Sequence, residues 1–470
     1  MKKIIQMNLK YKIRTIKALW LMLVAIMVLV SCKVTENYKR PSGIADNKLY
    51  RDVNTTDTTT IADIPWKQIF SDTLLQGLIQ EGIDNNLDLK IAMARIKQAQ
   101  ANLRQTNAAF YPTLDGQVSA TDQKLANTGS KSEFYQLYGS SSWEADLWGK
   151  LKSTKRAALA ALLQNDTYKK AVQTQLVSDI ATNYYALLAY DAQLQVTIKT
   201  VENRTLDVVT MKQLKESDVV TGAAVVQSEA NRYSAEVTIP DLRQNIRETE
   251  NALSILLGRN PGGIARDCLN NQRVRIDLQT GIAAKLLANR PDVQEAEYQL
   301  RYYFELTNVA RTYFYPSLTI TAAGGLSSAS ISQLFSASSL FGNIVGGLVQ
   351  PIFNQGLNKQ RLRVAQAQQE EYIVSFKKAL LTAGLEVSNA LYNYQAATDK
   401  MKIRSQQIDF LEKSVEFTKE LLKYTVNTNY TDVLTSEQSL LAAQLSSVSD
   451  KVQQLQAIVA LYRSLGGGWK

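Results

Sequence analysis

The stretch Phe110-Tyr111-Pro112-Thr113-Leu114 marks a change from one apolar period to another. Before it, apolar residues recur at helical spacing, and after it they alternate in twos, as in a strand with one apolar face. Proline cannot continue a helix because it lacks an amide hydrogen, and it biases the preceding residue towards an extended conformation. The same change recurs 204 residues later, at Phe314-Tyr315-Pro316-Ser317-Leu318. The chain is therefore predicted to pass from helix to strand twice.

Two alternating strands follow each of these changes, near residues 113–147 in the first half and near 317–354 in the second. Even-numbered positions from Leu114 to Ala120 are apolar or small, whereas odd-numbered positions from Asp115 to Thr121 are polar. Each strand is therefore predicted to have one apolar and one polar face.

Long helical patterns flank the strands of the first half. One runs from about residue 74 to about 109, with a capping sequence near 85–88. A proline-free pattern from about 153 to about 216 predicts a helix of roughly 95 Å. After a break at 217–222 a helix returns to Gly258, and Pro240 within it predicts a kink.

The second half repeats this order. Helices are predicted from about 286 to 312 and from about 358 to 426, followed by a break at 427–430 and a return to Gly466. The two returning helices align at an offset of 208 residues, through the pairs Val225/Val433, Ser228/Ser436, Glu229/Glu437, Ala235/Ala443, Leu253/Leu461, Leu257/Leu465 and Gly258/Gly466. The sequence thus predicts a duplication of about 205 residues, with repeats at 74–265 and 266–470.

The N-terminal residues 1–31 have the pattern of a signal peptide. Six basic and no acidic residues precede the apolar run Ala18–Val30, which is too short to span a bilayer. The run ends in Leu29-Val30-Ser31-Cys32, which indicates a lipoprotein with Cys32 acylated at the mature N-terminus. The alternative is ordinary cleavage, with Cys32 incidental. Residues 32–73 are polar and are predicted to form an extended, lipid-anchored tether, in which Trp66 and Phe70 dock on another part of the protein.

Charge and composition argue against several classes of function. The formal net charge of +10 falls to +4 once the six basic residues of the signal are removed, so nucleic-acid binding is not expected. The sequence contains no histidine, which rules out histidine-dependent catalysis and histidine-ligated metals. No nucleotide-binding motif is present, and no pair of carboxylates can be placed in one cleft. No enzyme activity and no cofactor are predicted.

Amphipathic strands of this kind suit the wall of a membrane barrel with a wet interior. Four strands cannot close a barrel, and an open edge in lipid leaves backbone groups unpaired, so several copies would have to share one barrel. A small water-soluble sheet packed on the helices is the alternative. Aromatic residues at the helix–strand junctions favour the membrane interpretation, because such residues gather at lipid–water interfaces.

Five segments, spread in order over nearly the whole mature chain, resemble the TolC-type outer-membrane efflux channels, specifically their lipoprotein branch. They are Ser142-Trp143-Glu144-Ala145-Asp146-Leu147-Trp148-Gly149-Lys150, Leu286-Leu287-Ala288-Asn289-Arg290-Pro291-Asp292, Phe314-Tyr315-Pro316-Ser317-Leu318, Gln350-Pro351-Ile352-Phe353 and Leu465-Gly466-Gly467-Gly468-Trp469. The resemblance implies a mainly α-helical homotrimer with a 12-stranded barrel in the bacterial outer membrane and a helical barrel in the periplasm. It also implies a periplasmic adaptor protein and an inner-membrane pump, commonly of the resistance-nodulation-division type, as partners.

The resemblance also assigns candidate gate residues. Asp432 matches an aperture carboxylate that would form a ring favouring cations. The alternative is a carboxylate at a helix start, where the helix dipole favours negative charge. Tyr424 matches a tyrosine that holds the closed state. Thr435 stands where a second aspartate is common, and the glycine usual in the second tip is replaced near Asn427, which leaves the closing contacts open.

Two further groups of residues are candidates by position. Residues at the helical tips are candidates for adaptor docking: Thr221, Gly222, Asn429 and Tyr430. Residues at the helix–strand junctions are candidates for a belt at the outer-membrane lipid interface: Tyr111, Pro112, Trp148, Tyr315, Pro316 and Phe353.

Two alternatives to efflux stay open at this stage. The same fold and gate would serve as the outer channel of a type I protein-export system. A periplasmic coiled-coil scaffold lipoprotein without a pore is less favoured, and its strands would then pack against its own helices.

Overall fold

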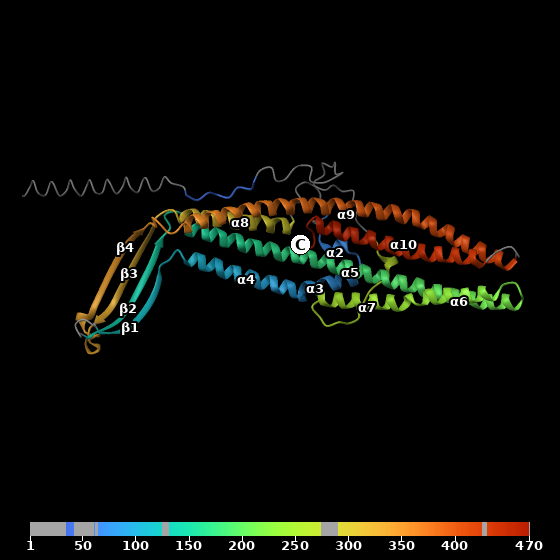
Figure 1. Cartoon of the computed structure of the whole chain (residues 1–470), viewed down its shortest axis with the longest axis horizontal. Coiled ribbons are helices and arrows are strands. Elements are labelled where there is room, and N and C mark those ends of the chain that lie inside the picture. Colours follow the sequence, from blue (N-terminus) through green and yellow to red (C-terminus); the bar gives the residue numbers. More distant parts are fainter. Residues whose placement is uncertain are drawn as a thin grey trace, which may run out of the picture. The chain divides into compact units, whose positions relative to one another are not determined.

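The computed structural model describes residues 34–41, 61, 64–124, 131–273, 290–424 and 430–469. These residues divide into two compact units, and Figure 1 labels their helices and strands. The first unit contains the sheet and the helical segments next to it, from residues 98–163 and 298–374, together with residues 34–41. The second contains the remaining helical segments and the hairpin tips. The predicted signal peptide, residues 1–31, and Cys32 lie outside the described residues.

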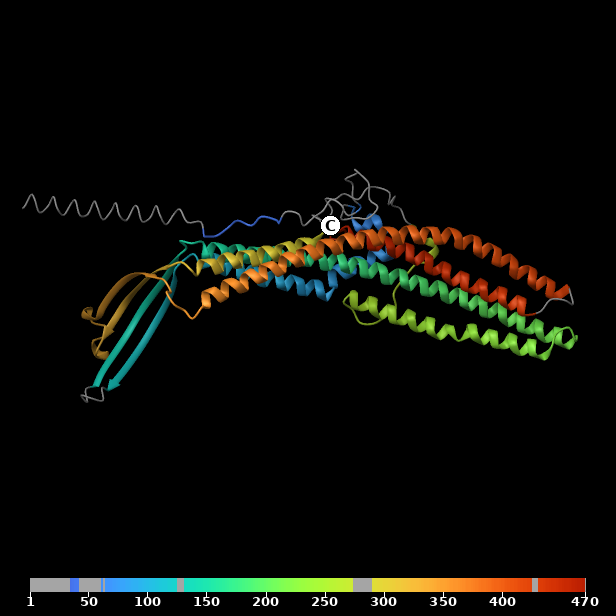
Figure 2. The same ribbon diagram turned by 45° about the horizontal axis from the view of Figure 1, so that its top comes forward.

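The first unit holds one antiparallel sheet of four strands in the order β1-β2-β3-β4. The strands are β1 (Thr113–Lys124), β2 (Lys131–Ala145), β3 (Ser317–Ser328) and β4 (Leu340–Val349). The turned view in Figure 2 shows them side by side in one curved layer. The two predicted strand pairs are therefore confirmed, and β2 and β3 join the pairs into one sheet with Trp143 opposite Ile320.

The helices of the first repeat follow the predicted order. The first pattern is divided into α3 (Thr73–Asn85) and α4 (Leu87–Ala108) at Asn86, whose side chain accepts a hydrogen bond from the Leu89 amide (3.1 Å). The predicted cap near 85–88 is thus confirmed. The long helix α5 covers Lys150–Glu216. None of the helices in the described part of the chain is long and apolar enough to cross a membrane.

The returning helix of the first repeat is interrupted close to the predicted kink. It consists of α6 (Gly222–Glu236) and α7 (Thr238–Leu256), and the interruption falls at Val237. Pro240 lies in the first turn of α7, where its missing amide hydrogen costs little. The helix therefore breaks one turn before the proline, as expected from the clash of the ring with the preceding turn.

The second repeat contains α8 (Pro291–Thr312), α9 (Leu357–Tyr424) and α10 (Tyr430–Ser464). The helix was expected to start at about residue 286. Residues 286–289 lie outside the described part, but Arg290 is described and is not helical, so the expectation was wrong for this residue. Pro291 is the first helical residue, because proline fits the first position of a helix far better than its interior.

Most of the N-terminal segment that the structure describes is docked rather than free. Trp66 begins the short helix α2 (Trp66–Ile69) and is 5% exposed, and Phe70 is 2% exposed. Both belong to the main apolar core of the second unit, where Phe70 meets the ring of Tyr462 edge-on with ring centroids 6.3 Å apart. The predicted docking of these aromatics is confirmed.

The duplication reappears in how α7 and α10 end. Each helix is followed by a glycine with positive φ, Gly258 (68°) and Gly466 (88°), which are the two residues aligned at an offset of 208. After α7, the Arg259 amide bonds to Ser254 O and the Gly258 amide to Ile255 O, both at 3.0 Å. The Gly467 and Gly466 amides bond to Tyr462 O and Arg463 O in the same way. Both ends are therefore Schellman motifs, which satisfy carbonyls that a helix end leaves unpaired.

We expect Gly258→Ala to lower the free energy of unfolding by about 1–3 kcal/mol, because it adds left-handed strain and a steric clash. A Cβ at this position would lie 2.5 Å from the backbone oxygen of Asn85. Gly263→Ala is the matched control, since a Cβ there would have nothing within 4 Å. Chemical unfolding followed by circular dichroism measures both, and equal midpoints would contradict this prediction.

Candidate channel wall and gate

The register of the sheet gathers the apolar side chains of all four strands on one face. Val118 pairs with Leu137, and Leu137 pairs with Leu326, which in turn pairs with Leu340. The side chains of Leu114, Val118 and Ile344 are 83%, 81% and 79% exposed. This apolar face is therefore not covered by any described part of the chain, which contradicts a water-soluble sheet packed on its own helices.

The opposite face of the sheet is mainly polar. The same register places Gln117 beside Tyr138, whose hydroxyl contacts the Gln117 side chain, and Ser142 beside Thr321. One face therefore suits lipid and the other suits water, as in the wall of an outer-membrane channel.

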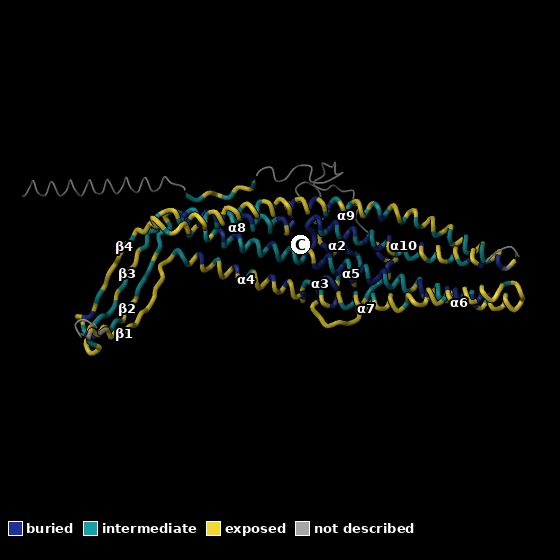
Figure 3. Tube along the Cα trace, in the orientation of Figure 1, coloured by how far each residue is buried: buried dark blue, intermediate teal, exposed yellow. Residues whose placement is uncertain are grey.

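Both outer strands of the sheet have a free edge. β1 pairs only with β2, and β4 pairs only with β3, among the strands that the structure describes. Every described side chain of β1 is exposed (Figure 3). A long free edge leaves a row of backbone donors and acceptors without partners, which in lipid costs several kcal/mol for each group. The sheet is consequently incomplete as a membrane structure.

A glycine permits the close approach of β2 and β3 on the polar face. Gly325 lies opposite Tyr138 on β2 and opposite Phe341 on β4, and the two rings meet edge-on at 5.9 Å. The aromatic rings thus cover a position that has no side chain of its own, a device that stabilises glycine in sheets.

We expect Gly325→Ala to separate β2 from β3 locally and to reduce the amount of assembled protein in the outer membrane several-fold. A Cβ at Gly325 would lie 2.2 Å from Leu137 O and 2.5 Å from the Tyr138 Cα, and both are backbone atoms that cannot rotate away. The neighbouring Gly324→Ala is the control, because its nearest contact would be an ordinary 3.6 Å. Quantification of the oligomer in outer-membrane fractions distinguishes them; a normal yield for the Gly325 variant would refute the argument.

Only part of the predicted junction belt is brought together. The indole of Trp148 donates a hydrogen bond to Pro316 O (2.7 Å), and its ring lies 4.9 Å from that of Tyr315. Tyr111 and Phe353 are 74% and 86% exposed. Exposed aromatics where an apolar sheet meets helices suit a lipid–water boundary.

Near the tips, an apolar cluster joins the two helical hairpins of the second unit. It consists of Met211 from α5, Val225 from α6, Leu422 from α9 and Tyr430 and Val433 from α10. Tyr430, predicted as a docking residue, is only 7% exposed. Its hydroxyl faces Ser228 and Asn231 of α6, and burial raises its pKa. The structure therefore places Tyr430 in the contact between hairpins rather than on a docking surface.

A charged cluster lies beside this apolar one and links three helices. The ammonium of Lys419 on α9 lies 3.0 Å from Asp207 Oδ1 on α5 and 2.6 Å from Glu437 Oε1 on α10. Burial raises the pKa of Glu437, and the nearby Asp207 raises it further, against the lowering effect of Lys419. Burial acts to lower the pKa of Lys419, but its two carboxylate partners outweigh burial and the pKa is raised. Two carboxylates thus share one cation.

The predicted gate residues lie at the surface of the single chain. Asp432 is exposed in the first turn of α10, and Thr435 is exposed with its hydroxyl bonded to Thr431 O at 2.8 Å. Tyr424 is the last residue of α9 and is 84% exposed. Within the described part of this chain nothing covers Tyr424, so its predicted closing contact would require another subunit or residues 425–429. Asn427 and Asn429 lie in that stretch, outside the described residues.

The first tip is a tight reversal between α5 and α6. The Val219 amide bonds to Leu214 O (2.9 Å) and the Asp218 amide to Lys215 O (3.0 Å), with Asp218 at φ 55°. Thr221 then caps α6 by its extended backbone, and Gly222 begins the helix. Thr221 and Gly222 are both exposed. Their role in docking stays a prediction.

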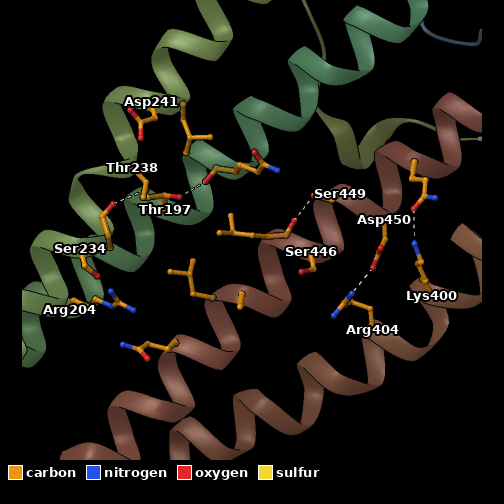
Figure 4. Close-up of a pocket in the computed structure, with 18 residues that line it drawn as sticks. Thr197, Arg204, Ser234, Thr238, Asp241, Lys400, Arg404, Ser446, Ser449 and Asp450 are labelled. Carbon is orange, nitrogen blue, oxygen red and sulfur yellow. Dashed lines mark hydrogen bonds and ion pairs between the residues drawn. The ribbon is translucent and has the colours of Figure 1, made fainter.

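An open groove of about 760 Å³ lies between the two hairpins of the second unit, further from the tips (Figure 4). It is lined by residues of α5, α6, α7, α9 and α10, and both charge signs are present. Arg404 pairs with Asp450 at 3.0 Å, and Lys400 donates to the Gln453 side chain at 3.0 Å. No cluster of three potential metal-ligating side chains occurs in the described residues.

Sequence reasoning missed the charged cluster of Asp207, Lys419 and Glu437. The three residues are separated by 212 and 18 positions, and lysine and acidic residues are ordinary on helix surfaces. The only available signal was the aligned pair Glu229/Glu437, which was used for the duplication and not for charge.

An amphipathic sheet with two free edges, continued by long helical hairpins, defines a subunit of a membrane channel. The family of outer membrane efflux proteins matches residues 78–259 and 282–467, one match in each repeat. The chain belongs to this family, and it is an outer-membrane efflux protein.

Relatives cover almost the whole chain. The cation efflux system protein CusC of Escherichia coli O157:H7 is 28% identical over 458 residues, covering 94% of this chain and 97% of CusC. The probable outer membrane lipoprotein SilC of Salmonella typhimurium is 26% identical over 450 residues, with 94% and 97% covered. The antibiotic efflux pump outer membrane protein ArpC of Pseudomonas putida is 26% identical over 466 residues, with 96% of each covered.

The fold is also that of a solved channel. The structure of CusC, described as showing transmembrane channel formation, superposes with a TM-score of 0.85 at 26% identity and covers 93% of this chain and 100% of that chain. These relatives are transport proteins, and this chain belongs to the same family of outer membrane efflux proteins.

Proposed function

We propose that three copies of this chain form the outer-membrane conduit of a tripartite efflux system. The observation that carries the proposal is the uncovered apolar face of a sheet whose two outer edges are free. In an up-and-down barrel, β4 of one copy pairs with β1 of the next, because the strands alternate in direction. Eight strands would leave an interior filled by side chains, so three copies and twelve strands are the smallest assembly with an open lumen.

An exposed apolar seam along α9 supports association between copies. Side chains 56–73% exposed recur at spacings of 7, 4, 7, 11, 7 and 7 residues, namely Val374, Leu381, Leu385, Tyr392, Ile403, Phe410 and Phe417. Such spacing is that of a coiled-coil seam without its partner helix. On α6 and its continuation, Val226, Tyr233 and Val237 are 58–69% exposed at spacings of 7 and 4 and would supply a matching seam in the next copy.

The conduit would be passive, with a periplasmic adaptor at the hairpin tips and an inner-membrane pump supplying energy and selectivity. The substrates would be small molecules or metal ions, since CusC and ArpC are named for cations and antibiotics respectively. Three copies would place three Asp432 carboxylates at the mouth, where a ring of negative charge favours cations. Cys32 would carry the lipid anchor, as the lipoprotein name of SilC supports.

Native mass spectrometry and planar-bilayer recordings of the detergent-extracted, lipidated protein test this proposal together. Trimers that form channels are expected, and a monomer without conductance would overturn it. Asp432→Ala should raise the resting conductance or lower the preference for cations. Asp409→Ala, which removes an exposed carboxylate paired with Lys413 within α9, is the control. If the two variants behave alike, Asp432 is not at the aperture.

A further inference from the structure

The first described residues of the chain, 34–41, form an extended segment of the first unit (Figure 1). Side chains of α5 and α8 hold this segment in place. We call this segment the N-terminal strap. Its central contact is with Asn308 of α8, whose amide oxygen accepts from the Glu36 backbone amide (3.1 Å) and whose amide nitrogen donates to the Glu36 carbonyl (2.9 Å). Asn308 therefore recognises both backbone groups of one residue, as a neighbouring strand would.

Asn308 is fully buried, which makes this recognition costly to lose. Its side chain is 0% exposed, and its second amide hydrogen is directed to Glu305 Oε2 at 3.1 Å. Glu305 is itself 1% exposed and pairs with Arg156 of α5 at 3.1 Å. Without the strap, the Asn308 amide would lose both of its partners on the Glu36 backbone, at a position from which the strap and the helices together exclude water.

Side chains of the strap add specificity. The Glu36 carboxylate pairs with Arg311 of α8 at 2.7 Å, and the Tyr38 ring meets Phe304 edge-on at 5.6 Å. Asn37 accepts a hydrogen bond from Arg156 at 3.3 Å. The strap thus contacts both α5 and α8 through backbone, charge and aromatic contacts, which is more than a passive tether requires.

The start of the strap is fixed at the helix–strand junction. Thr35 packs against Gly149, where a Cβ would come within 3.1 Å of the Thr35 hydroxyl, and Gly149 has a φ of 78°. Gly149 stands between Trp148 and the first residue of α5. Cys32 precedes Thr35 by three residues, so an extended chain can carry it no more than about 11 Å from this contact.

We propose that the site on α5 and α8 binds the N-terminal strap to hold the acylated Cys32 at the helix–strand junction. The acyl chains then enter the membrane at the level of the Trp148–Tyr315 pair, and the strap fixes the depth of the sheet relative to the lipid anchor. This rests on the lipid attachment and the membrane-inserted sheet given under the proposed function. It assigns residues 34–41 a positioning role that a flexible tether could not have.

Peptide binding tests the site directly. In the full lipidated chain, residues 34–38 are replaced by glycine and serine at unchanged length, and a fluorescent peptide of residues 34–41 is added. We expect saturable binding, and at least a tenfold loss of affinity for the peptide carrying Glu36→Lys or for the protein carrying Arg311→Ala. Arg363→Ala, an exposed arginine on α9, is the control and should bind normally. Absence of saturable binding, or equal affinity of the Glu36→Lys peptide, would overturn the proposal.

Two insertions test the depth function. Ten glycine and serine residues are placed either between Lys33 and Val34, which separates the anchor from the strap, or after Pro41, which leaves both in place. A spin label at Val118→Cys, in a Cys268→Ser background, reports depth in the bilayer. Only the first insertion should shift the mean depth of the spin label or broaden the distribution of its depths. Identical depths of the label in both insertion variants would overturn the positioning role. Conductance is recorded in parallel, because loss of channels in the unmodified protein would instead refute the proposed function.

Discussion

Arg290→Ala is expected to destabilise the end of α10 by about 2–3 kcal/mol, because it removes a buried cation that two carboxylates share, and both of these carboxylates are partly exposed and screened by water. Arg290 is 3% exposed and immediately precedes α8. Its guanidinium donates to Ser464 O at 2.7 Å and pairs with Asp292 at 2.6 Å and Glu386 at 2.7 Å. One side chain therefore caps the last turn of α10 and ties it to α8 and α9.

The pKa shifts show how the network depends on this cation. Burial acts to raise the pKa of Asp292, but Arg290 outweighs burial and the pKa is lowered. A carboxyl with a lowered folded-state pKa contributes stability near neutral pH that is lost as the pH falls through that pKa. The Arg290 variant should lose this contribution, so its stability should depend less on pH in the acidic range than that of the unmodified protein.

Hydrogen exchange of the amides from Leu461 to Gly466 measures the effect locally. A loss of about 3 kcal/mol corresponds to roughly 100-fold faster exchange. Arg259→Ala is the control, since Arg259 pairs with Glu81 at 3.0 Å but both side chains are about a third exposed. Exchange that is equally slow in both variants would show that Arg290 is not needed to cap α10.

The sheet could be predicted from the sequence because lipid and water impose a strict alternation on a strand. Leu114 and Asp115 already identify the two faces, and the register needs only that like faces coincide. The duplication could also be predicted, because Gly258 and Gly466 align at an offset of 208 residues. In the structure both glycines follow their helices with a positive φ. Proline and glycine constrain the backbone directly, so their positions carry structural information without any knowledge of the partner residues.

Contacts between distant elements could not be predicted in this way. The sequence of residues 34–41 predicts an extended polar tether. In the structure, however, Asn308 holds Glu36 through its backbone amide and carbonyl, which almost every residue possesses. Tyr430 was predicted to be a docking residue from its position at the tip. Nothing in the sequence around it shows that Val225 and Met211 pack against it. Such contacts depend on which helices lie side by side, and local patterns do not specify that.

Lys419→Ala is expected to weaken the link between the two hairpins near the tips by about 2–3 kcal/mol. The ammonium is shared by Asp207 and Glu437, and its removal leaves two partly buried carboxylates facing each other without a cation. The value is below that of a fully buried network because the Lys419 side chain is 32% exposed and water screens part of the interaction.

Hydrogen exchange at the start of α10 should become roughly 30- to 100-fold faster in Lys419→Ala. Lys413→Ala is a close control, since Lys413 lies on the same helix but pairs only with Asp409 one turn away, with both side chains more than half exposed. That variant should exchange as the unmodified protein does. Similar acceleration in both variants would mean that the total positive charge of α9, rather than the ammonium shared by Asp207 and Glu437, holds the hairpins together.

The raised pKa of Glu437 gives the same link a defined pH dependence. A carboxyl whose folded-state pKa is raised binds its proton more tightly in the folded form, so its contribution to stability falls as the pH rises from the ordinary glutamate pKa past the raised one. The hairpin link should therefore be firmer in mildly acid solution than at neutral pH, and Glu437→Gln should abolish this difference. Glu437→Gln should also restore part of the stability that Lys419→Ala loses, because only one uncompensated carboxylate then remains. A double variant no more stable than Lys419→Ala alone would show that repulsion between Asp207 and Glu437 is not what the lysine neutralises.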